Sequence, residues 1–120
     1  MEARKDDYKD GKARWDLLPW EAIEQIVNIY TFGAQKYAPD TWQHLPDGIK
    51  RYKAAMMRHL VEDEKGHLYD DESKLLHAAH MAWNAVAVLY LRMQEAKENK
   101  EESIAGDRDD ISIIEIQNIR

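Results

Sequence analysis

The chain of 120 residues contains no cysteine, and this absence removes several kinds of protein and of site. Without cysteine there is no disulfide scaffold, no zinc site built from thiolates and no thiol nucleophile. Long apolar runs are also missing, since no stretch approaches the ~18 apolar residues that a membrane span needs. The N-terminus lacks the apolar region of a signal peptide. We therefore expect a cytoplasmic protein with no membrane partner.

An excess of basic residues is missing as well, because 17 Lys and Arg stand against 23 Asp and Glu, for a net charge of −6. A protein that binds duplex nucleic acid normally needs a basic face, so we expect no such partner. Residues 95–110 hold seven acids against three bases and little to bury. This composition predicts a helical domain over residues 1–98, followed by an acidic linker and apolar tail over 99–120, with residues 111–116 as a short strand or an apolar segment that docks on a partner.

Apolar residues recur at helical spacing in three parts of the chain, which predicts an all-α fold, a small bundle of three helices. The first helix is expected at about 19–37, opening at Pro19, and the second at about 49–65, stopping at Gly66. The third is expected at about 71–97, with Asp70 and Asp71 as candidate caps. It is apolar on nearly every side, as buried helices are, and in so short a chain this predicts a homo-oligomer, a dimer or higher.

Polar side chains interrupt the apolar helices where the second and third helices would face each other. His77, His80 and Asn84 share one side of the third helix, and antiparallel packing brings His59 of the second helix level with them. Carboxylates such as Asp70 and Glu72 lie near the same end. Imidazoles and carboxylates together suit a divalent metal, which could polarise a phosphoryl oxygen and activate water. One buried histidine is more often structural, but three of them with several acids favour a functional site.

A second group of residues has the chemistry to bind a phosphorylated ligand. Arginine offers a bidentate fork and lysine a point charge to phosphate, while a tryptophan in a loop can stack on a base or cover the core. Each basic side chain taken alone is more often a solvated surface charge. The candidates are Lys12, Arg14, Lys36, Trp42 and Arg58.

Several short segments in a fixed order carry a resemblance to a known family. They are residues 11–19 (GKARWDLLP), 32–37 (FGAQKY), Trp42, 58–60 (RHL), 70–73 (DDES), 77–80 (HAAH) and Asn84. Together, over about residues 9–93, they resemble the phage-borne family named for the N-terminal domain of dATP/dGTP diphosphohydrolases. The resemblance implies hydrolysis of purine deoxynucleoside triphosphates to monophosphate and pyrophosphate, in the host cytoplasm if the chain is phage-encoded.

The family is similar to all-α nucleotide pyrophosphatases of the MazG type, which hold Mg²⁺ or Mn²⁺ with two acidic pairs on helices. The corresponding slots here are His59-x-x-Glu62 and His77-x-x-His80. Two positions depart from the family pattern: His67 stands where an acid is usual, and Lys74 where glycine is usual. The resemblance implies a Mg²⁺ or Mn²⁺ site of His59, Asp70, Glu72, His77 and His80, catalytic roles for His59, Glu72, His77 and Asn84, and substrate binding by Lys12, Arg14, Lys36, Trp42 and Arg58.

Two other classes of protein can be compared with this interpretation. Phosphohydrolases of the HD type need a His-Asp dipeptide, and none of the five histidines is followed by aspartate. A non-catalytic module is the open alternative: the same cleft could bind a nucleotide without turnover, or the acidic and apolar C-terminal residues could bind a host protein.

Overall fold

The computed structural model describes residues 11–106, and side chains over residues 11–102. Within this part of the chain lie three α-helices, α1 (Trp20–Lys36), α2 (Gly48–Glu64) and α3 (His77–Gly106). Two 3-10 turns, η2 (Trp15–Leu17) and η3 (Thr41–His44), precede α1 and α2. No β-strand occurs between residues 11 and 106, so the prediction of an all-α bundle of three helices is confirmed.

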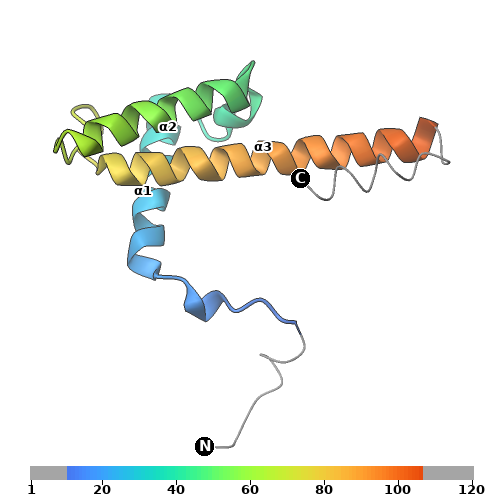
Figure 1. The fold of residues 1–120 in the computed structure, drawn as a ribbon, viewed down its shortest axis with the longest axis horizontal. Coiled ribbons are helices and arrows are strands. Elements are labelled where there is room, and N and C mark those ends of the chain that lie inside the picture. The colour runs from blue at the N-terminus through green and yellow to red at the C-terminus, as the bar shows by residue number, and fades with distance from the viewer. Residues whose placement is uncertain (1–10, 107–120) are drawn as a thin grey trace, which may run out of the picture.

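The helices are arranged as an antiparallel pair crossed by a third helix (Figure 1). α2 and α3 lie side by side along the length of α2, and α3 continues well past it. α1 packs against α3 near the end at which α2 and α3 are joined. The N-terminal half of α1 projects away from the pair, so this part of the helix has few neighbours within its own chain.

The bounds of α1 and α2 follow from local signals in the sequence. Pro19 is the N-cap of α1, and Glu21 lies in its first turn, where the positive end of the helix dipole favours an acid. After α2, Gly66 adopts a φ of +87° and its N–H donates to the carbonyl of Asp63, 3.0 Å away. Glycine favours this left-handed conformation, so the predicted stop at Gly66 is confirmed.

The predicted start of the third helix at residue 71 is wrong, because α3 begins at His77 and runs to Gly106. The preceding residues fold back on themselves, with an antiparallel bridge between Tyr69 and Leu76. Lys74 has a φ of +65°, which no α-helix accommodates. Lys74 is also the position where the resembling family usually has glycine, the residue that this backbone conformation favours.

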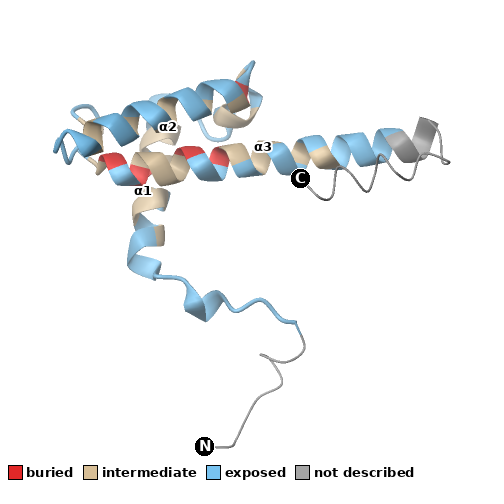
Figure 2. Ribbon diagram, viewed as in Figure 1, coloured by how far each residue is buried: buried red, intermediate tan, exposed pale blue. Residues whose placement is uncertain are grey.

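The interior of the chain is small, and an aromatic cluster supplies most of it. The buried apolar residues in the described part are Ile29, Ala79 and Ala87, and no large side chain there is fully buried (Figure 2). Five aromatic rings pack edge to face, with contacting centroids 5.2–5.9 Å apart, an arrangement that their quadrupoles favour. They belong to Tyr30, Trp42, Tyr52, Trp83 and Tyr90.

Within the single chain the third helix is buried on one side, so the prediction that a second subunit buries the rest stays a prediction. His77, Ala79, Asn84 and Ala87 are buried, whereas Leu89 is 59% exposed. None of the helices among residues 11–106 has the length and apolar character of a membrane crossing. The strand predicted at 111–116 lies outside the described residues, and the boundary predicted at residue 98 stays a prediction, with α3 continuing through it.

Candidate functional site

A group of three possible metal ligands lies where α2, α3 and their connecting loop meet. His59 comes from α2, His77 is the first residue of α3, and Asp70 comes from the loop. One ligand atom from each side chain lies within 4.8 Å of the other two. The Nδ1 atoms of His59 and His77 are 2.8 Å apart, so one ring donates a hydrogen bond to the other. The convergence of His59 and His77 that the sequence predicts is therefore present.

The loop between α2 and α3 fixes the position of the Asp70 carboxylate. The backbone N–H of Ser73 donates to Asp70 Oδ2 over 2.8 Å, and the Asp70 N–H donates to the carbonyl of Leu75 over the same distance. Burial alone would raise the pKa of the Asp70 carboxyl, but the hydrogen bonds from Ser73 hold that pKa below its ordinary value. Asp70 is therefore a carboxylate at neutral pH.

His80 lies one helical turn after His77 and supports the group from the side. Its ring stacks on that of His59, with centroids 4.4 Å apart and planes tilted by 10°. Its Nε2 atom is 2.7 Å from the Ser73 hydroxyl and 3.8 Å from Asp70 Oδ2. Burial lowers the pKa of His80, although the Asp70 carboxylate opposes this shift. His80 thus helps to position Ser73, the residue whose N–H binds the Asp70 carboxylate.

The protonation states of His59 and Asp70 suit metal binding. Burial, followed by the neighbouring His80 and His77, lowers the pKa of His59 to about 4, so this imidazole is neutral at physiological pH. Neutral imidazole and ionised carboxylate are the forms that coordinate metals. Two imidazoles with one carboxylate fit Mn²⁺ or another transition metal better than Mg²⁺, which prefers oxygen ligands. The donor set thus fits a divalent ion.

Glu72 is directed elsewhere, although the sequence analysis placed it in the metal site. Its carboxylate forms an ion pair with the ammonium group of Lys36, at the C-terminal end of α1. This hydrogen bond to Glu72 raises the pKa of Lys36. The pair joins α1 to the loop that carries Asp70, and it leaves His59, Asp70 and His77 as the group that the structure brings together.

A pocket of about 970 Å³ opens beside this group. It is lined by rings of the aromatic cluster and by charged and amide side chains. Trp42 and Tyr52 are held together by a hydrogen bond from the Tyr52 hydroxyl to the Trp42 carbonyl, 2.6 Å long. Of the residues that the sequence analysis singled out, the pocket is lined by Lys36, Trp42, Glu72, His80 and Asn84.

The pocket also has lining residues that the sequence analysis missed, above all Arg51. A signal for Arg51 existed, because it lies four residues before Ala55 and therefore shares the helix face that Ala55 turns inward. Tyr30, Tyr52 and Trp83 are lining residues too, but sequence alone treats such rings as core. Burial raises the pKa of both Tyr30 and Tyr52, so their hydroxyls stay protonated.

Other singled-out residues lie away from this pocket or have local partners. Lys12 and Arg14 are exposed before α1, where Arg14 pairs with Asp16 over 2.8 Å. Arg58 is exposed next to His59. Asn84 is 4% exposed, and its Nδ2 donates to the His80 carbonyl over 2.8 Å. Substrate binding by Lys12, Arg14 and Arg58 stays a prediction.

His67 and Glu62, the other residues singled out near this end, pair with each other. His67 Nδ1 lies 2.9 Å from Glu62 Oε1, and this hydrogen bond lowers the pKa of Glu62. Glu62 is therefore engaged outside the group of His59, Asp70 and His77, unlike the acid in the corresponding slot of the MazG-type pattern.

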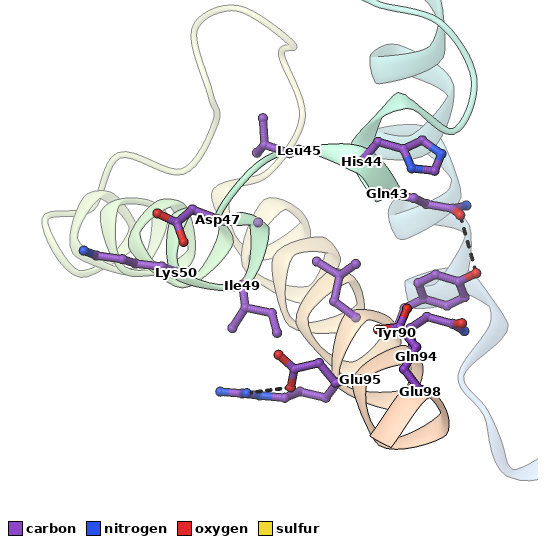
Figure 3. A pocket seen from close by; sticks show the side chains of 13 residues that line it. Gln43, His44, Leu45, Asp47, Ile49, Lys50, Tyr90, Gln94, Glu95 and Glu98 are labelled. Carbon is purple, nitrogen blue, oxygen red and sulfur yellow. Dashed lines mark hydrogen bonds and ion pairs between the residues drawn. The ribbon is translucent and has the colours of Figure 1, made fainter. Parts of the chain in front are cut away.

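A second pocket lies between the start of α2 and the C-terminal half of α3 (Figure 3). Gln43 accepts a hydrogen bond from the Tyr90 hydroxyl at its edge, 3.4 Å long, and Arg92 pairs with Glu95. Its lining contains none of the residues that the sequence analysis selected. The candidate site is therefore the first pocket, whose lining residue His80 contacts His59 and lies 3.8 Å from Asp70.

The fold and site define a class of protein: an all-α domain with a His/Asp/His group beside an aromatic pocket. The chain belongs to the dATP/dGTP diphosphohydrolase, N-terminal, family, which it matches over residues 2–101. A protein of Salmonella phage PMBT28 named dATP/dGTP diphosphohydrolase is 36% identical over 84 residues, 70% of this chain. The chain spans only 28% of that relative's length. No solved structure matches the chain.

Proposed function

We propose that this domain hydrolyses purine deoxynucleoside triphosphates to monophosphate and pyrophosphate with the help of a divalent metal ion. The observation that carries the proposal is the double position of His80, which stacks on His59 of the metal-binding group and also lines the pocket. A ligand in the pocket would thus lie next to the metal. Family membership and the name of the phage relative support the choice of substrate.

The lining of the pocket offers contacts to both parts of a nucleotide. Trp42 and its aromatic neighbours offer ring faces and edges to a base, and stacking on such rings contributes ~1–3 kcal/mol. Lys36 and Arg51 offer positive charge to the triphosphate. Because Lys36 pairs with Glu72, the triphosphate would compete with this carboxylate for the ammonium group.

His59, Asp70 and His77 would hold the metal, with Mn²⁺ preferred to Mg²⁺ because of the two imidazoles. When bound, the ion would polarise a phosphoryl oxygen and activate water. Water attacks the α-phosphorus. The bond between the α-phosphorus and the oxygen that bridges to the β-phosphorus breaks, and pyrophosphate leaves. Lys36 and Arg51 neutralise the charge of the phosphates, so the protein contributes positioning and electrostatics and needs no covalent nucleophile.

The test is to incubate the purified chain with each of the four deoxynucleoside triphosphates and Mn²⁺ or Mg²⁺, and to measure monophosphate and pyrophosphate. We expect turnover of the two purine substrates, faster with Mn²⁺. His77→Asn should lower the rate at limiting metal by about 10–100-fold. His44→Asn, in the exposed turn before α2, is the matched control and should leave the rate unchanged.

Two results would contradict the proposal. Monophosphate formation that is unaffected by His77→Asn and by chelation of metal would place the chemistry elsewhere. Stabilisation of the chain by a nucleotide without any turnover would instead support the non-catalytic nucleotide-binding module.

A further inference from the structure

One face of α3 is apolar and exposed to solvent. Its residues follow at intervals of four, three, four and four, a spacing that places them on one side of a helix. Leu89 is 59% and Met93 57% exposed, while the buried residues of α3 point to the other side. One charge borders this side between Ala78 and Met93: Arg92, three residues after Leu89, whose guanidinium pairs with Glu95 over 3.0 Å. The α3 face consists of Ala78, Ala82, Ala85, Leu89 and Met93, flanked by Val86.

The projecting half of α1 carries a second exposed apolar surface. Trp20, Ile23 and Val27 follow at i, i+3 and i+7, with Trp20 53% and Val27 50% exposed. The preceding turn η2 adds Trp15 and Leu17, each about two-thirds exposed. These residues, the α1 face, lie on the part of the chain that extends away from α2 and α3 (Figures 1 and 2).

Two such surfaces leave the described chain with too little apolar burial for an independent domain. Small domains are stabilised by one well-buried core, and large exposed apolar patches mark interaction sites. Here Ile29, Ala79 and Ala87 are the buried apolar residues among those described, and none of the large side chains is fully buried. These faces are therefore candidate interaction surfaces of the described part of the chain.

We propose that the α1 face of one copy of this chain packs on the α3 face of a second copy. The α1 face presents bulky Trp, Ile and Val side chains and the α3 face mostly alanine, so the large side chains of one face can occupy the space that the small ones of the other leave. In a two-fold symmetric dimer this contact occurs twice, so one partner covers all four faces. The contact does not depend on the proposed enzymatic activity.

The exposed area is sufficient for a stable dimer. Seven side chains of these faces are one-third to two-thirds exposed: Trp15, Leu17, Trp20, Val27, Val86, Leu89 and Met93. At roughly 100 Å² each they present about 700 Å² per copy, close to the ~800 Å² that each partner buries in a stable complex. Exposed apolar residues on α2, such as Met57 and Val61, lie among the charges of Lys53 and Arg58, so α2 is the less favourable surface.

The absence of cysteine allows a direct test of the contact. Val27→Cys and Leu89→Cys are prepared separately in the full chain, with tags of different mass, then mixed and treated with a short bis-maleimide. We expect a cross-linked product of mixed mass, and no product from either variant alone. Lys53→Cys, on the exposed side of α2, is the control and should link to neither. No mixed product, linking of Leu89→Cys to itself, or linking through Lys53→Cys would overturn the proposal.

The mass of the full chain in solution gives a second, independent measurement. Light scattering coupled to size exclusion should show a dimer at micromolar concentration. Leu89→Glu and Val27→Glu, each with helicity checked by circular dichroism, should raise the dissociation constant at least about tenfold, or ~1.4 kcal/mol. Lys53→Glu should not. A monomer for the unsubstituted chain, or a dimer that all three variants leave intact, would refute the contact.

Discussion

The metal-free protein should lose stability as the pH falls from about 6.5 towards 4. Burial and the neighbouring His80 and His77 lower the pKa of His59 from 6.5 to about 4. Between these two values the unfolded chain binds a proton that the folded chain does not, so stability falls with falling pH. Above about 6.5 the imidazole is neutral in both states, and its contribution to stability is fully present.

The size of this loss can be bounded from the environment of His59. A pKa that falls from 6.5 to about 4 corresponds to ~3.4 kcal/mol, at ~1.4 kcal/mol for each pH unit. His59 is only partly buried, and solvent screening reduces such an energy, so we expect about 1–2 kcal/mol. For a domain of this size, that change lowers the Tm by about 4–15 °C.

The assay is thermal unfolding followed by circular dichroism, in chelator, over a series of pH values. Asp70 and Glu62 also destabilise the fold when protonated, but this loss begins only as the pH falls to their ordinary pKa values of 3.8 and 4.5, so the pH dependence above that range belongs mainly to histidine. His59→Gln should reduce the pH dependence in this window to the part due to His80, and His44→Gln should leave it unchanged. A Tm that is constant between about pH 6.5 and 4.5, or an equal slope in His59→Gln, would refute the reasoning.

Three further changes have measurable outcomes. Lys74→Gly should raise the Tm by a few degrees, because the φ of +65° costs a lysine ~1–2 kcal/mol. Gly66→Ala should lower the Tm, because it places a side chain at a φ of +87°. Lys36→Met should weaken triphosphate binding about tenfold by calorimetry, since a charge-assisted hydrogen bond contributes ~1.5–3 kcal/mol, and Lys53→Met is its control. Trp42→Ala should cost about 3 kcal/mol in urea unfolding because it removes edge-to-face contacts with three rings.

The sequence predicts α1 and α2 to within one residue at each end, because local signals decide both. Pro19 fixes φ at the start of α1, and Gly66 permits the positive φ that ends α2, so both act through the local backbone. The apolar stripe between such signals identifies a helix. The start of α3 is decided by a contact between residues that are not neighbours in sequence. Asp70 and Asp71 are good helix caps, but the bridge between Tyr69 and Leu76 involves residues seven apart in sequence, and no local pattern predicts it.

The candidate site shows the same division between local and tertiary information. Antiparallel packing of two helices is enough to bring His59 to His77 and His80, so periodicity predicts that part. The choice between two nearby acids depends on the loop, which turns Asp70 towards the histidines and Glu72 towards Lys36 on another helix. Arg51 has the inward spacing of Ala55, but only the folded pocket shows that its face adjoins Trp42 and Lys36.

The late start of α3, which the sequence does not predict, and the metal-binding group have one physical cause. Asp70 and His77 are seven residues apart, and in a continuous helix from about residue 70 they would be separated by ~10 Å along the axis. One ion could not contact both side chains over that distance. The turn at Ser73 and Lys74 shortens this path, so that both residues offer ligand atoms within 4.8 Å of each other and of His59. The left-handed backbone at Lys74 is therefore needed for the site as well as for the fold. It turns the chain so that α3 begins at His77, with the His77 side chain close to Asp70.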